Sequence, residues 1–194
     1  MLIDTLSDQS GREIIFGDFD IMSAGPRFTS YTQNNLLYQY WSQKGGQQKR
    51  ISRDHINPSE LKPALKHIVM MDILPGKSPY IPKEIPLSAQ HDFALQVRLI
   101  GTFVSDFYGE ITGKDIYQMP HPTATNRIYH MSALAKESQQ PQLSVASGYT
   151  PGKDHLKAYG LYLPLFNHDQ QTQDLIVDKI LVFVDVVTLH DKTI

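Results

Sequence analysis

The sequence predicts an α+β domain with one five-stranded antiparallel sheet, helices over one face of that sheet, and an amphipathic helix near the N-terminus. Two observations predict this class. Along the chain, two strand-like segments come first, helical segments follow, and three strand-like segments come last. The last three are separated by turn signals, Pro151-Gly152 and the polar run 167–170. The length of 194 residues suits one domain with appendages.

The first helix is expected after an irregular start. Residues 1–32 are interrupted by glycines and by scattered Ser, Asp and Thr, so the domain proper should span residues 33–190. Asn34–Lys44 has the apolar spacing of an amphipathic helix, and Gly45-Gly46 should end it. Its apolar stripe consists of Leu36, Leu37, Tyr40 and Trp41.

The first strand is expected after a short capped helix. Asn57 is a suitable N-cap, Pro58 suits the first helical position, and Pro63 limits the length of this helix. The apolar run His67–Leu74 then has strand length. Four prolines within residues 75–90 exclude a regular element, so an extended surface insertion is expected there.

The second strand and the main helix follow. Alternation over Phe93–Val104 predicts a strand that Gly101 interrupts, and Thr102–Tyr108 should form a short helical turn. Thr123–Ser138 is predicted as a longer helix. Pro164 indicates a sheet edge or a bulge. The three closing strands are Gln142–Tyr149, Leu156–Phe166 and Leu175–Val187.

The last strand predicts that both faces of the sheet are covered. Ile180–Val187 is apolar on both faces apart from Asp185, whereas a sheet with one exposed face alternates more cleanly. The first helix can supply this cover, and a partner subunit is the alternative. We therefore expect the stripe of the first helix to form an interface, and a homodimer to be the natural assembly.

Composition excludes several classes of function. The chain contains no cysteine, which rules out disulfides, thiolate nucleophiles, zinc–thiolate sites and flavin–cysteine adducts. A formal net charge of -2 gives no reason to expect nucleic acid or an anionic membrane as a partner. The N-terminus lacks the pattern of a signal peptide and no apolar run reaches membrane-spanning length, so a cytoplasmic location is expected.

Several motifs resemble one protein family. They are Trp41, the Pro58–Leu61–Pro63 pattern, the run Arg98-Leu99-Ile100-Gly101-Thr102, the later Gly109–Lys114 block, and Leu163-Pro164-Leu165. Together with the order of elements they resemble a bacterial family of single-domain PAS-like proteins, over roughly residues 34–187. The resemblance implies a PAS fold and a sensory or signalling role. The insertion at residues 75–90 and the Gln140-Pro141 sequence after the long helix depart from the pattern of the family.

The resemblance also implies where a ligand would bind. PAS domains hold small molecules between sheet and helices, or bind only protein. His130, on the long helix, is where a haem-binding PAS domain would place its axial ligand, and a surface or partly buried histidine with no ligand is the alternative. Arg98 faces either an anionic ligand or solvent. The candidate ligand-binding residues are Arg98, Tyr108, Arg127, His130 and Tyr149.

No catalytic or metal-binding motif is recognisable. HExxH, a P-loop, a Rossmann glycine motif and a Gly-x-Ser-x-Gly elbow are all absent, so an enzyme is not expected. The chain holds no recognisable output domain, and we expect it to act in trans through another protein, with or without a small ligand. A ligand-free scaffold whose core is filled by its own side chains is the alternative, and the identity of any cofactor stays open.

Overall fold

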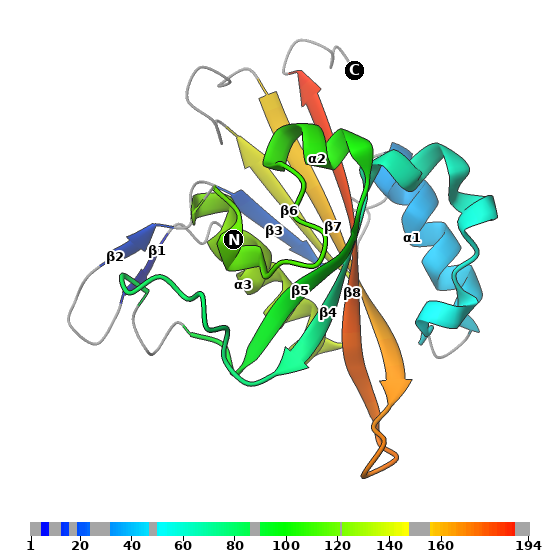
Figure 1. Ribbon diagram of the computed structural model, residues 1–194. Helices are drawn as coiled ribbons and strands as arrows, with labels where there is room; N and C mark the ends of the chain where they lie inside the picture. The colour runs from blue at the N-terminus through cyan, green and yellow to red at the C-terminus, as the bar shows by residue number, and fades with distance from the viewer. Residues whose placement is uncertain are drawn as a thin grey trace.

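In the computed structural model, a twisted antiparallel sheet forms the middle layer of the protein (Figure 1). The structure describes residues 5–7, 13–15, 19–23, 32–46, 50–85, 90–120, 122–147 and 156–188. The strands are β1 Thr5–Ser7, β2 Glu13–Ile15, β3 Phe19–Ser23, β4 Ile68–Pro75, β5 Phe93–Ile100, β6 Gln142–Ser147, β7 Leu156–His168 and β8 Leu175–Thr188. The helices are α1 Thr32–Lys44, α2 Thr102–Tyr108 and α3 Pro122–Ser138, with 3-10 helices η3 Arg53–His55, η4 Pro58–His67 and η6 Ile116–Gln118.

The sheet contains six strands in the order β3-β6-β7-β8-β4-β5, and every pairing is antiparallel. Five of these strands are those that the sequence predicts. The expectation that residues 1–32 are irregular is wrong for three short segments: β1 pairs with β2, and β3 joins the sheet beside β6. These strands have three to five residues, which is too short for periodicity to reveal.

Helices α2, η6 and α3 lie over one face of the sheet (Figure 1). Asn57 caps η4 as expected, because its side chain accepts a hydrogen bond from the Ser59 N–H over 3.1 Å. Between Pro75 and Ile85 the structure has turns and irregular backbone, as the prolines predict, and residues 86–89 of this insertion lie outside the described part. No helix in the described ranges has the length and apolar character needed to span a bilayer.

The opposite face of the sheet is covered by α1. Leu37 and Trp41 are fully buried in the core, and the Trp41 indole N–H donates a hydrogen bond to the carbonyl O of Pro164 over 3.0 Å. Tyr40 accepts a hydrogen bond from the backbone N–H of Asn57 over 2.9 Å. Three of the four predicted interface residues therefore pack within the chain, and Leu36, 63% exposed, is the one that faces outward.

Gly101 fixes the position of η4 against the start of α2. A Cβ atom at this position would lie 2.4 Å from the carbonyl oxygens of Leu65 and Lys66, which is an impossible contact with backbone. The Gly101 N–H donates to the Ile68 carbonyl over 2.7 Å. The glycine of the Arg-Leu-Ile-Gly-Thr run is thus required by the close approach of two backbone segments.

Candidate functional site

A small cavity lies between the sheet and the layer of α2, η6 and α3. Its volume is about 40 Å³. Most of its walls are aliphatic, including Val69 and Met71 from β4, Val182 and Val184 from β8, and Ile116 from η6. A volume of this order holds about three waters, whereas sites for drug-sized ligands occupy about 300–1,000 Å³.

Hydrogen-bond donors gather at one part of the wall. Arg127 from α3, Ser144 from β6 and Tyr162 from β7 come together there, and the Ser144 hydroxyl donates to the carbonyl oxygen of Gly160 over 3.5 Å. All three side chains are buried. Burial raises the pKa of Tyr162 to about 12, while the nearby Arg127 cation acts in the opposite direction. The phenol therefore stays protonated at neutral pH and remains a donor.

Gly160 makes room for this cluster. A Cβ atom there would lie 2.9 Å from Ser144 Oγ and 3.0 Å from Tyr162 Cε2. Strand pairing places Gly160 opposite Ser144 on β6 and Val184 on β8, so the ring of Tyr162 lies over the gap that the missing side chain leaves. The glycine in the Tyr159-Gly160-Leu161-Tyr162 sequence thus positions a hydroxyl at the cavity wall.

The cavity brings together two of the residues that the sequence singled out. Arg127 and Tyr108 both line it, Tyr108 from the end of α2. Tyr149 lies outside the described residues. The remaining two, Arg98 and His130, do not line the cavity.

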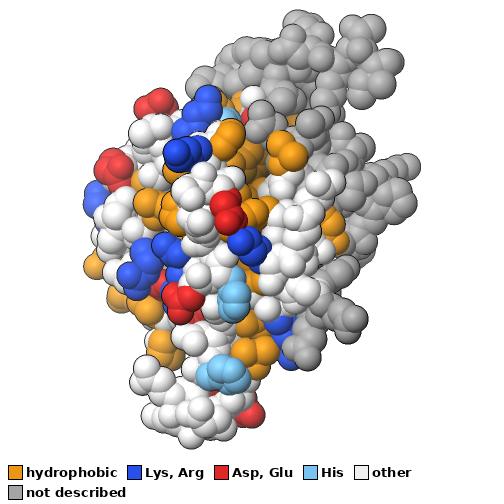
Figure 2. Space-filling view, turned by 90° about the vertical axis from the view of Figure 1, so that its right-hand side faces the viewer, with side chains coloured by type: hydrophobic (Ala, Val, Ile, Leu, Met, Phe, Trp, Pro, Cys, Tyr) orange, Lys and Arg blue, Asp and Glu red, His pale blue; other side chains and the backbone are white. Residues whose placement is uncertain are grey.

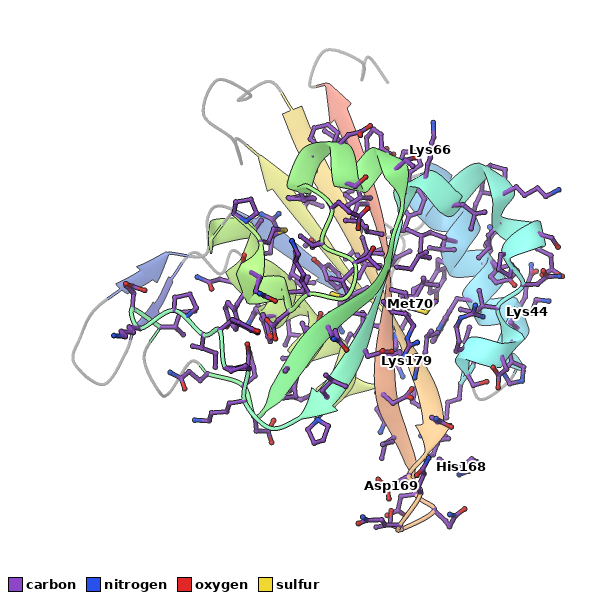
Figure 3. All side chains as sticks on the ribbon, viewed as in Figure 1. Lys44, Lys66, Met70, His168, Asp169 and Lys179 are labelled. Carbon is purple, nitrogen blue, oxygen red and sulfur yellow. The ribbon has the colours of Figure 1, made fainter. Side chains whose placement is uncertain are left out.

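Arg98 lies on the outer part of the sheet and is paired with a neighbouring strand. Its guanidinium Nε lies 2.8 Å from an oxygen of Asp72 on β4, and its NH2 nitrogen lies 2.6 Å from the same carboxylate. Lys179, labelled on β8 in Figure 3, is 3.8 Å from the other oxygen of Asp72. The Arg98 side chain is 59% exposed, so it serves a strand-to-strand ion pair beside solvent.

His130 is placed on a side of α3 away from the cavity. It lies near His91, and burial lowers the pKa of both imidazoles. A cavity of about 40 Å³ does not admit a haem or a flavin. The geometry therefore gives no support to the haem hypothesis at His130.

Sequence reasoning missed Tyr162 and Ser144, which complete the donor cluster. Both lie on alternating strand positions that sequence alone assigns to either face. The signal that could have found them is Gly160, because a glycine inside a long strand marks a place where another group comes close.

A second buried network fixes the helical layer to the edge of the sheet. The Tyr129 hydroxyl donates to the carboxylate of Asp115 over 3.1 Å and accepts from the Leu95 N–H over 3.0 Å. Its ring stacks on Tyr117 with centroids 4.2 Å apart. Because the bond to Leu95 satisfies an outward-pointing amide of the edge strand β5, we assign this network a structural role.

The described side chains contain no group of three His, Asp or Glu residues placed to hold a metal ion. The face formed by α1 and η4 mixes charges of both signs with apolar side chains (Figure 2). Comparison of the chain with protein-family models, with curated proteins and with solved structures found no match.

Proposed function

We propose that the protein is a PAS-type sensory or signalling module that acts in trans through protein–protein interaction. The observation that carries the proposal is the order of strands in the sheet. Counting only the five strands predicted from the sequence, the order is second, first, fifth, fourth, third. The helices between the second and third strands cover one face. The PAS fold predicts this arrangement, and β3 beside β6 is an addition to it.

Under this proposal the protein catalyses no reaction of its own. Its core instead responds to a bound molecule or a partner, and the response changes an outer surface. The proposal includes a homodimer, formed through the outward side of α1, where Leu36 is exposed. Because Leu37 and Trp41 pack inside the chain, that interface has to be built from Leu36 and its exposed neighbours.

A partner complex tests the proposal. Chemical crosslinking in the source cells, followed by purification and mass spectrometry, should give one stoichiometric complex with a second protein or a second copy. The variant Leu36→Glu should weaken that complex while leaving the unfolding midpoint unchanged, because the Leu36 side chain is exposed. A protein that is recovered alone and monomeric by light scattering at tens of micromolar would contradict the proposal.

A ligand-free scaffold is the second candidate, and the small cavity favours it. A volume of about 40 Å³ means that side chains fill most of the space between sheet and helices. Native mass spectrometry of freshly purified protein separates the two candidates. The sensor should carry a bound small molecule, and the scaffold should show the mass of the bare chain.

A further inference from the structure

We propose that the slot between the ends of β4 and β8, lined by residues 73–76 and 175–178, binds an extended peptide segment of a partner protein. The peptide pairs with the edge of β8 and carries a basic residue at its C-terminal end. This inference rests on the proposed function, since it names the class of partner through which the module acts in trans. It concerns a surface separate from the outward side of α1.

The slot exists because two neighbouring strands of the sheet separate. The ladder between β4 and β8 ends at Asp72 and Lys179. Beyond it β4 continues to Pro75 beside β5, and β8 begins at Leu175 beside β7. Figure 1 shows β4 and β8 diverging toward the tip of the β7–β8 hairpin. The slot between them has a volume of about 470 Å³, within the range of about 300–1,000 Å³ that is typical of ligand sites.

Backbone groups of β8 face the slot at alternate residues. In an antiparallel pair, opposite residues either exchange hydrogen bonds or both direct their backbone groups away from each other. Phe166 directs its N–H away from β8, to the segment that follows α1, so Val177 opposite it directs its N–H and C=O toward the slot. The Asp169 N–H donates to the Asp174 carbonyl, so the next residue, Leu175, also faces the slot. This spacing of two residues matches the repeat of an added strand.

The β4 side of the slot is oriented in the same way. Ile73 lies opposite Leu95, whose N–H bonds the Tyr129 hydroxyl on the side of β5 away from β4, so Ile73 directs its backbone groups toward β8. Leu74 and Ile176, 38% and 40% exposed, add apolar side chains on the two sides of the slot. An open strand edge beside exposed apolar side chains is a template for another strand. The slot therefore suits an extended peptide better than a compact small molecule.

The two ends of the slot differ in charge. At the closed end, the Lys179 ammonium lies beside the carboxylates of Asp72 and Asp178 (Figure 3). Asp92 and Asp169 line the open end, and in the described part of the chain neither of these two carboxylates forms a salt bridge. Complementary charge steers and orients a partner, so a basic side chain is favoured at the open end.

Two details of the open end bear on this charge. Hydrogen bonds from the backbone N–H groups of Thr172 and Gln171 lower the pKa of Asp169, so its carboxylate is ionised at neutral pH. Lys136 is the one cation among the described lining residues, and its ammonium lies 5.4 Å from the centre of the Phe93 ring. Two carboxylates against one ammonium leave this end negative. Because β8 begins there, a peptide antiparallel to β8 places its C-terminal residue at this end.

Backbone amides give a direct readout in the unmodified protein. The probe is the synthetic peptide acetyl-Val-Thr-Val-Thr-Lys-amide, in which strand-forming residues precede a lysine. Its addition to ¹⁵N-labelled protein should shift the amide signals of Leu175 and Val177 with saturation. Hydrogen exchange at both amides should become slower, because their N–H groups become donors to the peptide. The Ile176 amide, which faces β7, should change much less. No saturable response at Leu175 and Val177 would overturn the inference.

Two altered peptides separate strand pairing from other modes of contact. A peptide whose backbone nitrogens are all methylated keeps its side chains and charge but loses its donors, so its binding should be weaker by at least about tenfold. A peptide with Glu in place of Lys should bind about 5- to 10-fold more weakly at low ionic strength, and salt should reduce this difference. The inference is refuted if either altered peptide binds as well as the probe.

Variants of the protein assign the slot. Leu175→Pro removes an N–H that faces the slot, and proline is tolerated at the first residue of a strand, so binding should weaken at least about fivefold. Asp92→Lys should have an effect of similar size at low ionic strength. Asp106→Lys is the matched control, because Asp106 is exposed on α2 and does not line the slot, and it should leave binding unchanged. If Leu175→Pro does not fold, equal binding by the two lysine variants still contradicts the inference.

Other occupants of the slot give different results. If a segment of this chain filled it, the Leu175 and Val177 amides would be protected in the free monomer. If a second copy filled it, their protection would rise with protein concentration. Either result replaces the partner peptide and overturns the inference.

The inference and the proposed function fail separately. A partner complex that depends on Leu36, with no response to the peptide, leaves the signalling module standing and removes the slot as its binding site. Absence of any partner complex after crosslinking removes the proposed function even where the peptide binds.

Discussion

The indole N–H of Trp41 donates a hydrogen bond to the carbonyl oxygen of Pro164, and this bond joins the N-terminal helix to the middle of the sheet. Strand β6 pairs with β7 only as far as Tyr162, so the edge of β7 beyond that residue has no strand partner. Because Pro164 has no N–H, only its carbonyl oxygen needs a partner at this edge, and that oxygen accepts the hydrogen bond from the indole N–H of Trp41. Two residues on, the Phe166 N–H donates to the Ile51 carbonyl over 2.7 Å. The part of the β7 edge that has no strand partner is thus hydrogen-bonded by α1 and by the segment that follows α1.

This relationship predicts the effect of removing the indole N–H. Trp41→Phe keeps an aromatic ring and leaves the buried Pro164 carbonyl without its donor, so the free energy of unfolding should fall by about 1–3 kcal/mol. Trp41→Ala also creates a cavity and should cost about 3–5 kcal/mol. Urea denaturation measures both. Leu36→Ala, on the exposed side of the same helix, should stay within about 0.5 kcal/mol of the parent protein. Equal losses for Trp41→Phe and Leu36→Ala would contradict the role given to this bond.

Gly101 provides a test of the close approach between η4 and α2. A methyl group at Gly101 would press on the Leu65 and Lys66 carbonyls, so Gly101→Ala should cost about 3 kcal/mol or more. Gly109 is the matched control. Its φ of 83° disfavours other residues, but nothing lies within 4 Å of a Cβ there, so Gly109→Ala should cost about 1–2 kcal/mol. The free energies of unfolding of the two variants, measured by heat and by urea, compare the cost of steric overlap at Gly101 with the cost of backbone strain at Gly109. The interpretation fails if Gly109→Ala is the more damaging change.

The hydrogen bonds of the Tyr129 hydroxyl predict that its removal destabilises the fold. Tyr129→Phe would leave the Leu95 N–H without a partner and would remove one of the hydrogen bonds to the Asp115 carboxylate, which keeps its bond from the Tyr117 N–H; the loss should cost about 1–3 kcal/mol. Hydrogen exchange at the Leu95 amide should also become faster, because the bond that protects it is gone. Tyr117→Phe keeps the ring stack and removes a hydroxyl outside this network, so it serves as the control. Unchanged exchange at Leu95 in Tyr129→Phe would refute the assignment.

The sequence predicted the main elements well because their periodicity is strong. The two apolar faces of Ile180–Val187 required a cover on both sides, and α1 provides the second one. The sequence alone does not determine the register in which the strands pair. The pairing of β4 with β5 shifts between Met70 and Met71, and it is this irregular register that brings Arg98 to Asp72, 26 residues away. The same limit hid Tyr162 and Ser144, since a strand's alternation does not say which of its faces meets the helices.

Two half-buried histidines predict how stability depends on pH. His91 stacks on Phe93 and Tyr129, with ring centroids 5.2 and 6.0 Å away, and burial lowers its pKa; burial also lowers the pKa of His130. The unfolded chain therefore binds more protons than the folded one as the pH falls below about 6.5, and the folded state loses stability there. The positive charge of Lys136 and the mutual effect of the two histidines act with burial on His91, while Glu137 and Asp92 act against it.

The free energy of unfolding should therefore decrease between about pH 7.5 and pH 5, as measured by urea denaturation. Glu60 and Glu110 have lowered pKa values and titrate below this window, so they do not obscure it. The double variant His91→Phe with His130→Asn should flatten the decrease, because neither site then takes up a proton on unfolding. His168→Asn, at the exposed tip of the β7–β8 hairpin (Figure 3), should retain the full slope. A decrease that survives in the double variant would place its origin in other groups.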